Sequence, residues 1–178
     1  WPWEEDLRYV RSVCERLGVE LRVVPLQKEY YERVIAFSLK EIRAGRTPNP
    51  DMLCNVHVKF GAFLESIGDA FDMVATGHYA QTGYRNGRWY LRTTPDTVKD
   101  QTYFLSQLTQ RQIARACFPI GVYRKSDVRR LAREFEFPTA ERKDSQGLCF
   151  LGKIDFSEFT AHHLGEREGD IVEKESSQ

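Results

Sequence analysis

Asp51 and Cys54 are the residues of this chain whose types and spacing best suit chemistry. A carboxylate stands three residues before a thiol, after a loop stiffened by two prolines and at the expected start of a helix. A thiolate is the nucleophilic form of cysteine, and a helix N-terminus or a nearby cation, such as Arg46 or Lys59, would favour that form. Asp51 would oppose it electrostatically, so we assign Asp51 a proton-transfer role. The residues alone do not separate this interpretation from a second one, which is equally favoured. In the second, Asp51 only caps a helix and Cys54 is a small buried side chain.

Cys149 is the second thiol with a setting of interest, in a short apolar segment at residues 147–151. Cys14 and Cys117 have apolar neighbours, and we interpret both as core residues. The four cysteines show neither a zinc-finger spacing nor a Cys-x-x-Cys pair. We therefore predict no metal site and no thioredoxin motif.

Alternating helices and strands must position these side chains. Apolar residues at helical spacing predict helices over 4–17, 28–44, 53–67 and 101–135, the last with Ser126 as an N-cap, and a helix that starts near 155 and ends at 163. β-branched or apolar runs predict strands over 20–26, 71–76 and from 169. Asn86-Gly87 predicts a type I′ turn between strands 79–84 and 88–93. This order implies an α/β fold with a parallel sheet and an attached hairpin.

The composition suits a folded domain without a membrane span. The 178 residues are 41% hydrophobic, no apolar run reaches the length of a span, and 26 basic residues balance 26 acidic ones. We expect a cytoplasmic protein. Residues 111–143 hold nine basic and four acidic residues. Such a stretch alone is more often a solvated helix face than a phosphate-binding surface.

Four sequence blocks, in this order, resemble the signature of the tRNA 2-thiouridylases, a family of the PP-loop ATP pyrophosphatase superfamily. The blocks are GRTPNPDMLCN at 45–55 with VKF at 58–60, ATGHYA at 75–80, KDQTYFL at 99–105 and KDSQGLCF at 143–150. One block would be weak evidence, but four in order across almost the whole chain are highly specific.

The resemblance implies a reaction and a fold. The fold would be a Rossmann-like parallel sheet of the adenine-nucleotide alpha-hydrolase type, with a β-hairpin and a helical insertion. The activity would be ATP-dependent 2-thiolation of the wobble uridine of tRNA, with ATP used together with Mg. The uracil would be adenylated, and sulfur from a cysteine persulfide would replace the activated oxygen. The partners would be tRNA and a sulfur-relay or cysteine-desulfurase-type donor.

The resemblance also implies roles for individual residues. Cys149 would carry the persulfide, and Cys54 would attack it, which frees the sulfur and forms a transient Cys54–Cys149 disulfide; direct attack by the persulfide on the base, with Cys54 resolving the product, stays open. Asp51 would be a general acid or base, and Gly77 would lie against the ATP. The residues expected to bind tRNA are Asn49, Pro50, Asp51, His78, Lys99, Asp100 and Gln101.

The chain departs from the family pattern in two ways. The family's Ser-Gly-Gly-x-Asp-Ser phosphate loop is absent from the 178 residues, and so is its C-terminal β-barrel. We therefore expect a fragment that is inactive alone, with the remainder of the catalytic domain at 1–165, a basic tRNA-binding insertion at about 101–140, and the start of a central domain at 166–178. A non-catalytic tRNA-binding module, a thiol sulfur-relay protein and an enzyme that adenylates another base are the alternatives.

Overall fold

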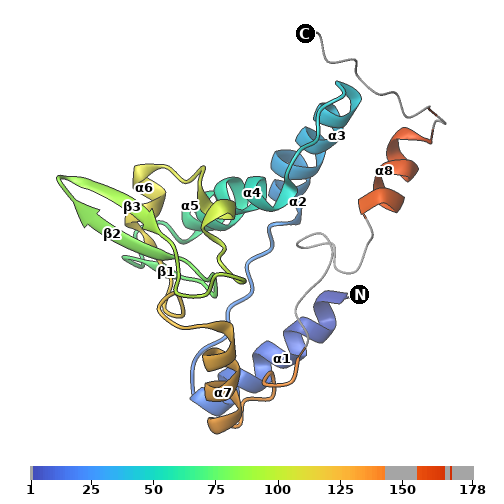
Figure 1. The fold of residues 1–178 in the computed structure, drawn as a ribbon. Coiled ribbons are helices and arrows are strands. Elements are labelled where there is room, and N and C mark those ends of the chain that lie inside the picture. The colour runs from blue at the N-terminus through green and yellow to red at the C-terminus, as the bar shows by residue number, and fades with distance from the viewer. Residues whose placement is uncertain (1, 143–155, 167–168, 170–178) are drawn as a thin grey trace.

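The computed structural model describes residues 2–142, 156–166 and 169, coloured along the chain in Figure 1. The helical elements are α1 (Pro2–Leu17), α2 (Gln27–Tyr30), the π-helical η1 (Tyr31–Ile35), α3 (Ala36–Arg43), α4 (Pro50–Cys54), the π-helical η2 (Asn55–Ala62), α5 (Phe63–Ile67), the 3-10 helix η3 (Thr102–Leu105), α6 (Gln110–Ala114), α7 (Lys125–Glu134) and α8 (Phe156–Leu164). The strands are β1 (Val74–Ala75), β2 (Gln81–Arg85), β3 (Arg88–Arg92) and β4 (Ala116–Cys117).

The described strands form one short parallel pair and one hairpin, which confirms the α/β prediction. β1 pairs in parallel with β4, with Val74 opposite Ala116. β4 lies within the region that we predicted to be helical over 101–135, and helix is found there only in η3, α6 and α7, so that prediction is wrong at 106–109 and 115–124. α6 ends at Ala114, and the chain then pairs with β1 through the N–H of Val74 and the carbonyl of Arg115 at 2.8 Å. β1 covers only Val74–Ala75, so it is shorter than the strand predicted over 71–76.

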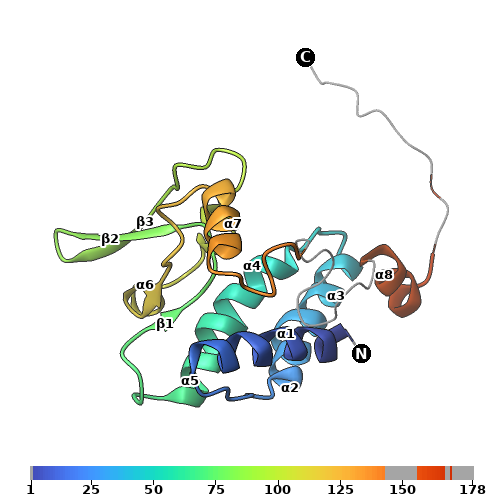
Figure 2. The same cartoon turned by 90° about the horizontal axis from the view of Figure 1, so that it is seen from below.

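The hairpin forms where the sequence places it. β2 and β3 are antiparallel, with Arg85 opposite Arg88. Asn86 and Gly87 have φ of 53° and 75°, the left-handed conformations that a type I′ turn requires. In Figures 1 and 2 the turn end of the hairpin extends away from the helices.

The predicted strand over 20–26 is wrong: this segment has no regular secondary structure. A strand needs a neighbour for its backbone groups, and the described part of the chain supplies none here. Val23 is 68% exposed, which is not the burial expected of a central strand. The β-branched run therefore forms an extended connection between α1 and α2.

The helix that runs from α4 through η2 to α5 separates two apolar cores. On one side, Cys54, Val58 and Ala62 pack against a cluster from Leu26 to Leu39. On the other side, residues such as Phe60 and Leu64 pack beneath the hairpin with α6 and β4. Because both faces are buried, the position of this helix is fixed from two directions.

Side chains from other elements complete the hydrogen bonds of the π-helical segment. Gln112 Nε2 donates to the carbonyls of Val56 and Phe60 at 2.7 and 2.9 Å. Arg33 donates to the carbonyl of His57 at 3.3 Å. π-helical segments occur often at functional sites, and this one begins directly after Cys54.

Candidate active site around Cys54

The helix that carries Cys54 begins at Pro50, three residues before the predicted start. Asn49 is its N-cap: its backbone is extended, and its Oδ1 accepts a hydrogen bond from the N–H of Met52 at 3.2 Å. Pro50 occupies the first helical position, where its missing N–H costs nothing. Asp51 is therefore not the cap, and Cys54 is not at the helix start but in its second turn.

The Cys54 side chain is fully buried, with 0% exposure. It belongs to an apolar cluster that includes Val34, Ile35 and Val58. This matches the alternative in which Cys54 is a small buried side chain. A reaction at Cys54 with any external group requires the residues that cover the thiol to move.

Arg46, one of the two cations expected near Cys54, is paired with a carboxylate of α3. Arg46 donates to both carboxylate oxygens of Glu41, at 2.5 and 2.7 Å. The ammonium group of Lys59 is close enough to His78 to disfavour protonation of that imidazole. The Arg46–Glu41 pair ties the Pro-rich loop to the end of α3, so its role here is to position the loop.

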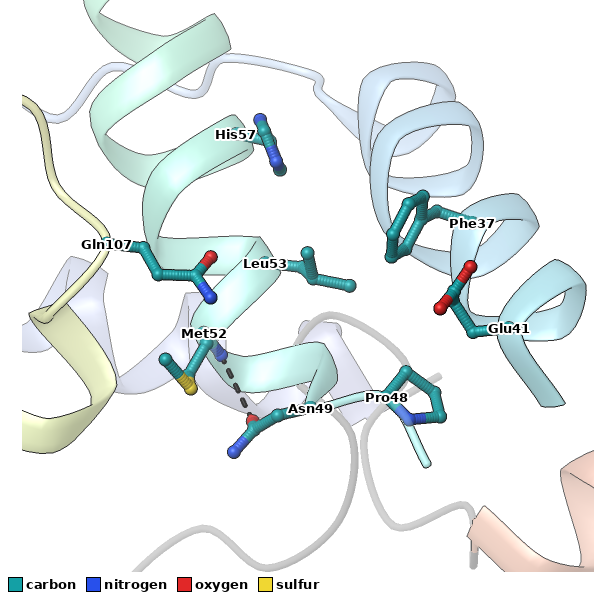
Figure 3. A pocket seen from close by; sticks show the side chains of 8 residues that line it. All are labelled: Phe37, Glu41, Pro48, Asn49, Met52, Leu53, His57 and Gln107. Atoms are coloured by element: carbon teal, nitrogen blue, oxygen red, sulfur yellow. Dashed lines mark hydrogen bonds between the residues drawn. The ribbon is translucent and has the colours of Figure 1, made fainter. Parts of the chain in front are cut away.

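A pocket of about 340 Å³ opens beside Asn49. Figure 3 shows α3 and the helix of Cys54 on opposite sides of it, with the Asn49 cap at one end. The lining residues are Phe37, Glu41, Pro48, Asn49, Met52, Leu53, His57 and Gln107. The lining combines apolar side chains with amide and carboxylate groups, a mixture that is typical of small-molecule sites.

His78 lies in the core rather than at the surface. Its Nδ1 is 2.7 Å from Thr76 Oγ1, and its ring packs edge-to-face on Phe118 and tilted on Phe60. Burial, together with the charge of Lys59, lowers the pKa of His78 from 6.5 to about 4. The imidazole is therefore neutral at neutral pH and does not offer a cation to a phosphate group; its contact with tRNA stays a prediction.

Gly77 follows β1, and the space beside its Cα is open. A Cβ placed on Gly77 would meet no atom within 4 Å, and φ is outside the left-handed region. Neither the fold nor the backbone therefore requires glycine here. Ligands of parallel α/β sheets bind beyond the carboxyl ends of the strands, which is where Gly77 lies.

Asp100 and Gln101 hold their own loop in place. Asp100 accepts hydrogen bonds from the N–H groups of Thr94 and Thr102 at 2.7 and 2.9 Å. Burial opposes its ionisation, but these bonds outweigh burial and keep the pKa of Asp100 below its ordinary value. Gln101 exchanges two hydrogen bonds with the backbone of Tyr79, at 2.8 and 3.0 Å. Their predicted contacts with tRNA are not tested by this geometry.

Asp96 is a residue that our sequence reasoning missed. Its carboxylate accepts hydrogen bonds from the N–H groups of Val98 and Lys99, both at 3.0 Å, and of Lys125 at 2.8 Å. These three donors hold the pKa of Asp96 below its ordinary value. Asp96 therefore joins the loop of Lys99 to the first turn of α7. Its position in a Thr-Thr-Pro-Asp-Thr stretch is a turn signal that could have revealed it.

Several of the nine basic residues at 111–143 are used inside the protein. The contacts are Arg115 with the carbonyls of Gly68 and Phe71, Arg129 with the carbonyl of Ala140, Arg130 with Glu134, Arg133 with Glu141, and Arg142 with Asp6. α7 begins with Arg124 as its N-cap, not Ser126. The tRNA-binding insertion and the domain limits stay predictions.

Cys149 and the block at 143–150 lie outside the described residues, so the approach of Cys54 to Cys149 stays a prediction. The Asp155 cap and the strand residues after 169 also lie outside the described residues, but the helix expected to end at His163 is present as α8. Cys14 and Cys117 are half-buried.

Among the described residues, no cluster of His, Cys, Asp and Glu could hold a metal ion, and no helix is long and apolar enough to cross a membrane.

Comparisons with known proteins identify the family. The family described as "tRNA methyl transferase HUP domain" matches residues 1–153. The chain is 50% identical over 175 residues to a tRNA-specific 2-thiouridylase MnmA of Porphyromonas gingivalis, covering 98% of this chain and 48% of the relative. It is 47% identical to relatives of the same name from Parabacteroides distasonis and Bacteroides thetaiotaomicron, over 98% and 97% of this chain and 49% of each relative.

The chain thus spans about half the length of these curated relatives. The match to the family covers most of the chain, and the relatives carry the name that the four sequence blocks indicated. The chain therefore belongs to the tRNA methyl transferase HUP domain family and is similar to the tRNA-specific 2-thiouridylases.

Proposed function

We propose that the product of the complete gene places sulfur on the 2-position of the wobble uridine of tRNA. The observation that carries this proposal is the similarity to 2-thiouridylases over nearly the whole chain. The geometry around Asn49 agrees with it. A capped, Pro-rich turn borders a pocket of about 340 Å³ and leads into the helix of Cys54. A uracil splayed out of the anticodon loop would enter this pocket beside Pro48 and Asn49, with Pro50 and the proton-transfer group Asp51 in the helical turn that follows.

The reaction needs an activated uracil, and ATP supplies that activation by converting the 2-oxygen into a leaving group. Gly77 fits a place against the nucleotide, because it lies at the end of β1 with open space beside its Cα. A charged phosphate chain would bring Mg with it. A cytoplasmic location completes the proposal.

The two cysteines balance the electrons of the sulfur transfer, because they become oxidised to a disulfide as the transferred sulfur is reduced. A persulfide on Cys149 holds a sulfur that is already oxidised, delivered by a relay or desulfurase-type donor. The Cys54 thiolate attacks Cys149 Sγ, forms the Cys54–Cys149 disulfide and releases the outer sulfur as hydrosulfide, which displaces the leaving group from uracil. In the second route the persulfide attacks the uracil directly, and Cys54 then releases the thiolated base. Both routes end in the same disulfide, which requires the two Cα atoms to come within roughly 7 Å.

The burial of Cys54 adds a requirement to either route. The thiol is buried in the cluster that includes Val34, Ile35 and Val58, so attack on Cys149 Sγ requires the persulfide to meet Cys54 within this apolar environment. Burial also protects a thiol from oxidants when no substrate is bound.

Substitution of the two cysteines tests this proposal. In the product of the complete gene, Cys54→Ser and Cys149→Ser should each abolish formation of 2-thiouridine, measured by mass spectrometry of digested tRNA, and leave tRNA binding intact. Cys14→Ser is the matched control, because Cys14 lies on α1 and belongs to none of the four sequence blocks, and it should keep activity. Thiolation retained in either test variant would refute the assignment. tRNA binding without thiolation in the unsubstituted protein would favour a non-catalytic binding module.

A further inference from the structure

The β2–β3 hairpin has two unlike faces. Trp89 and Leu91 point to one side and pack against the core beneath the hairpin. The alternate residues of β3 are exposed, and the register places each of them beside a β2 residue on the same outer face: Arg88 opposite Arg85, Tyr90 opposite Gly83, and Arg92 opposite Gln81. We call Arg85, Arg88, Tyr90 and Arg92 the arginine face.

The arginine face carries a charge that the described part of the protein does not neutralise. Arg85 and Arg88 are directly opposite each other, an arrangement in which like charges destabilise a hairpin. The sequence contains no Asp or Glu between Asp72 and Asp96, so the hairpin has no acidic residue of its own. An anionic partner would relieve the repulsion, and the planar guanidinium group suits phosphate.

Tyr90 adds a flat aromatic surface between the arginines. A Cβ on Gly83 would lie 2.4 Å from Tyr90 Cζ and 2.6 Å from its hydroxyl oxygen, so the outer end of the tyrosine ring occupies the space beside the glycine. Tyr90 is 41% exposed. A partly exposed aromatic ring that stands between Arg88 and Arg92 on the same face of β3 is a side chain on which an unpaired base can stack.

The arginine face continues into the loop that we predict to contact tRNA. Gln81 Nε2 donates to the carbonyl of Thr93 at 2.9 Å, and Thr102 Oγ1 donates to the carbonyl of Arg92 at 3.4 Å. These bonds fix the base of the hairpin to both ends of the loop that holds Lys99. Figures 1 and 2 show the hairpin extending from the body of the protein, which leaves room for a large partner.

We propose that the arginine face is an RNA-binding surface, in which the arginines contact phosphate groups and Tyr90 stacks on an unpaired base. The proposal rests on the proposed function for the identity of the RNA, a tRNA with uridine at the wobble position. It assigns to the hairpin a part of the tRNA contact that the family motifs do not contain.

Equilibrium binding of such a tRNA transcript to the product of the complete gene, measured by fluorescence anisotropy over a range of KCl concentrations, tests the proposal. The double variant Arg85→Ser/Arg88→Ser should bind about tenfold more weakly. Its salt slope should fall by roughly 1.4 to 1.8, because two phosphate contacts are lost. The matched control, Arg11→Ser/Lys28→Ser, removes two exposed positive charges elsewhere and should stay within about twofold of the unsubstituted protein with the same salt slope.

Variants of Tyr90 separate stacking from charge. Tyr90→Leu should weaken binding about tenfold, and Tyr90→Phe should keep it, because only the latter retains a ring. If Tyr90→Leu fails to fold, as judged by thermal unfolding, the arginine variants decide the matter, since their side chains are outside the core.

Unchanged tRNA affinity and salt slope in the arginine variants would overturn this proposal and leave the proposed function standing, because the unsubstituted protein still binds and thiolates tRNA. Weaker binding of a sulfur-donor protein with unchanged tRNA binding would also overturn it. A protein that binds no tRNA in any form would refute both.

Discussion

The buried imidazole of His78 makes the stability of this protein depend on pH. The pKa of His78 is lowered from 6.5 to about 4, first by burial and then by the charge of Lys59. Between these values the unfolded chain binds a proton that the folded protein does not, so stability falls as the pH drops through 6.5 and the loss is complete below about 4. At about 1.36 kcal/mol per pH unit, the full effect is roughly 3 kcal/mol, of which about 2 kcal/mol is lost between pH 7 and pH 5.

His78→Asn isolates this contribution. The asparagine amide can reach the Thr76 hydroxyl that Nδ1 contacts, but it does not titrate. Urea unfolding of both proteins at pH 7 and pH 5, followed by far-UV circular dichroism, gives the two free energies of unfolding. The unsubstituted protein should lose about 2 kcal/mol more than the variant over this interval. The difference between the two losses of unfolding free energy excludes the contribution of the carboxylates, because they titrate in both proteins.

The same experiment on His57→Asn serves as the control, since His57 is exposed and lies on the adjacent helix. That variant should follow the unsubstituted protein at both pH values. Equal losses of stability in the unsubstituted protein and His78→Asn would refute the reasoning, because they would mean that His78 is protonated in the folded state as readily as in the unfolded one.

Three further predictions concern single side chains. Gln112→Ala leaves the carbonyls of Val56 and Phe60 without this donor and should cost about 1–3 kcal/mol in urea unfolding; a cost below about 0.5 kcal/mol would contradict its structural role. Asp96→Ala should speed hydrogen exchange at the amides of Lys99 and Lys125, with Asp72→Ala, an exposed carboxylate without these bonds, as the control. Gly77→Ala should leave the midpoint of thermal unfolding within about 1 °C, because the site is open, yet weaken ATP binding by the product of the complete gene; tight ATP binding by this variant would place the nucleotide elsewhere.

Local signals were sufficient for several elements of the fold. α1 ends before Gly18, and α3 before Gly45, each glycine with a positive φ at the predicted cap. The hairpin follows from Asn86-Gly87 because few residue pairs accept two left-handed conformations in succession. In each case a short stretch of sequence contains the reason for the structure.

The errors arise where a distant partner decides. Residues 20–26 have the composition of a strand, but pairing requires a neighbour that no local pattern reveals. β4 is too short to interrupt the helical pattern around it, and only its pairing with β1 defines it. The early start at Pro50 is different: Asn49-Pro50 is an N-cap followed by a favoured first residue, so the signal was present.

The candidate site shows the same division between local and distant causes. Its residue types were predictable from spacing and from resemblance, but their environments were not. The helix of Cys54 passes into a π-helical segment whose carbonyls are satisfied by Gln112 from α6 and Arg33 from η1. Both faces of that helix are buried against separate cores, so Cys54 lies among apolar side chains that come from distant parts of the sequence. The accessibility of this thiol is therefore set by tertiary contacts, and a change at Gln112 or Arg33 should alter its reactivity without touching the motif itself.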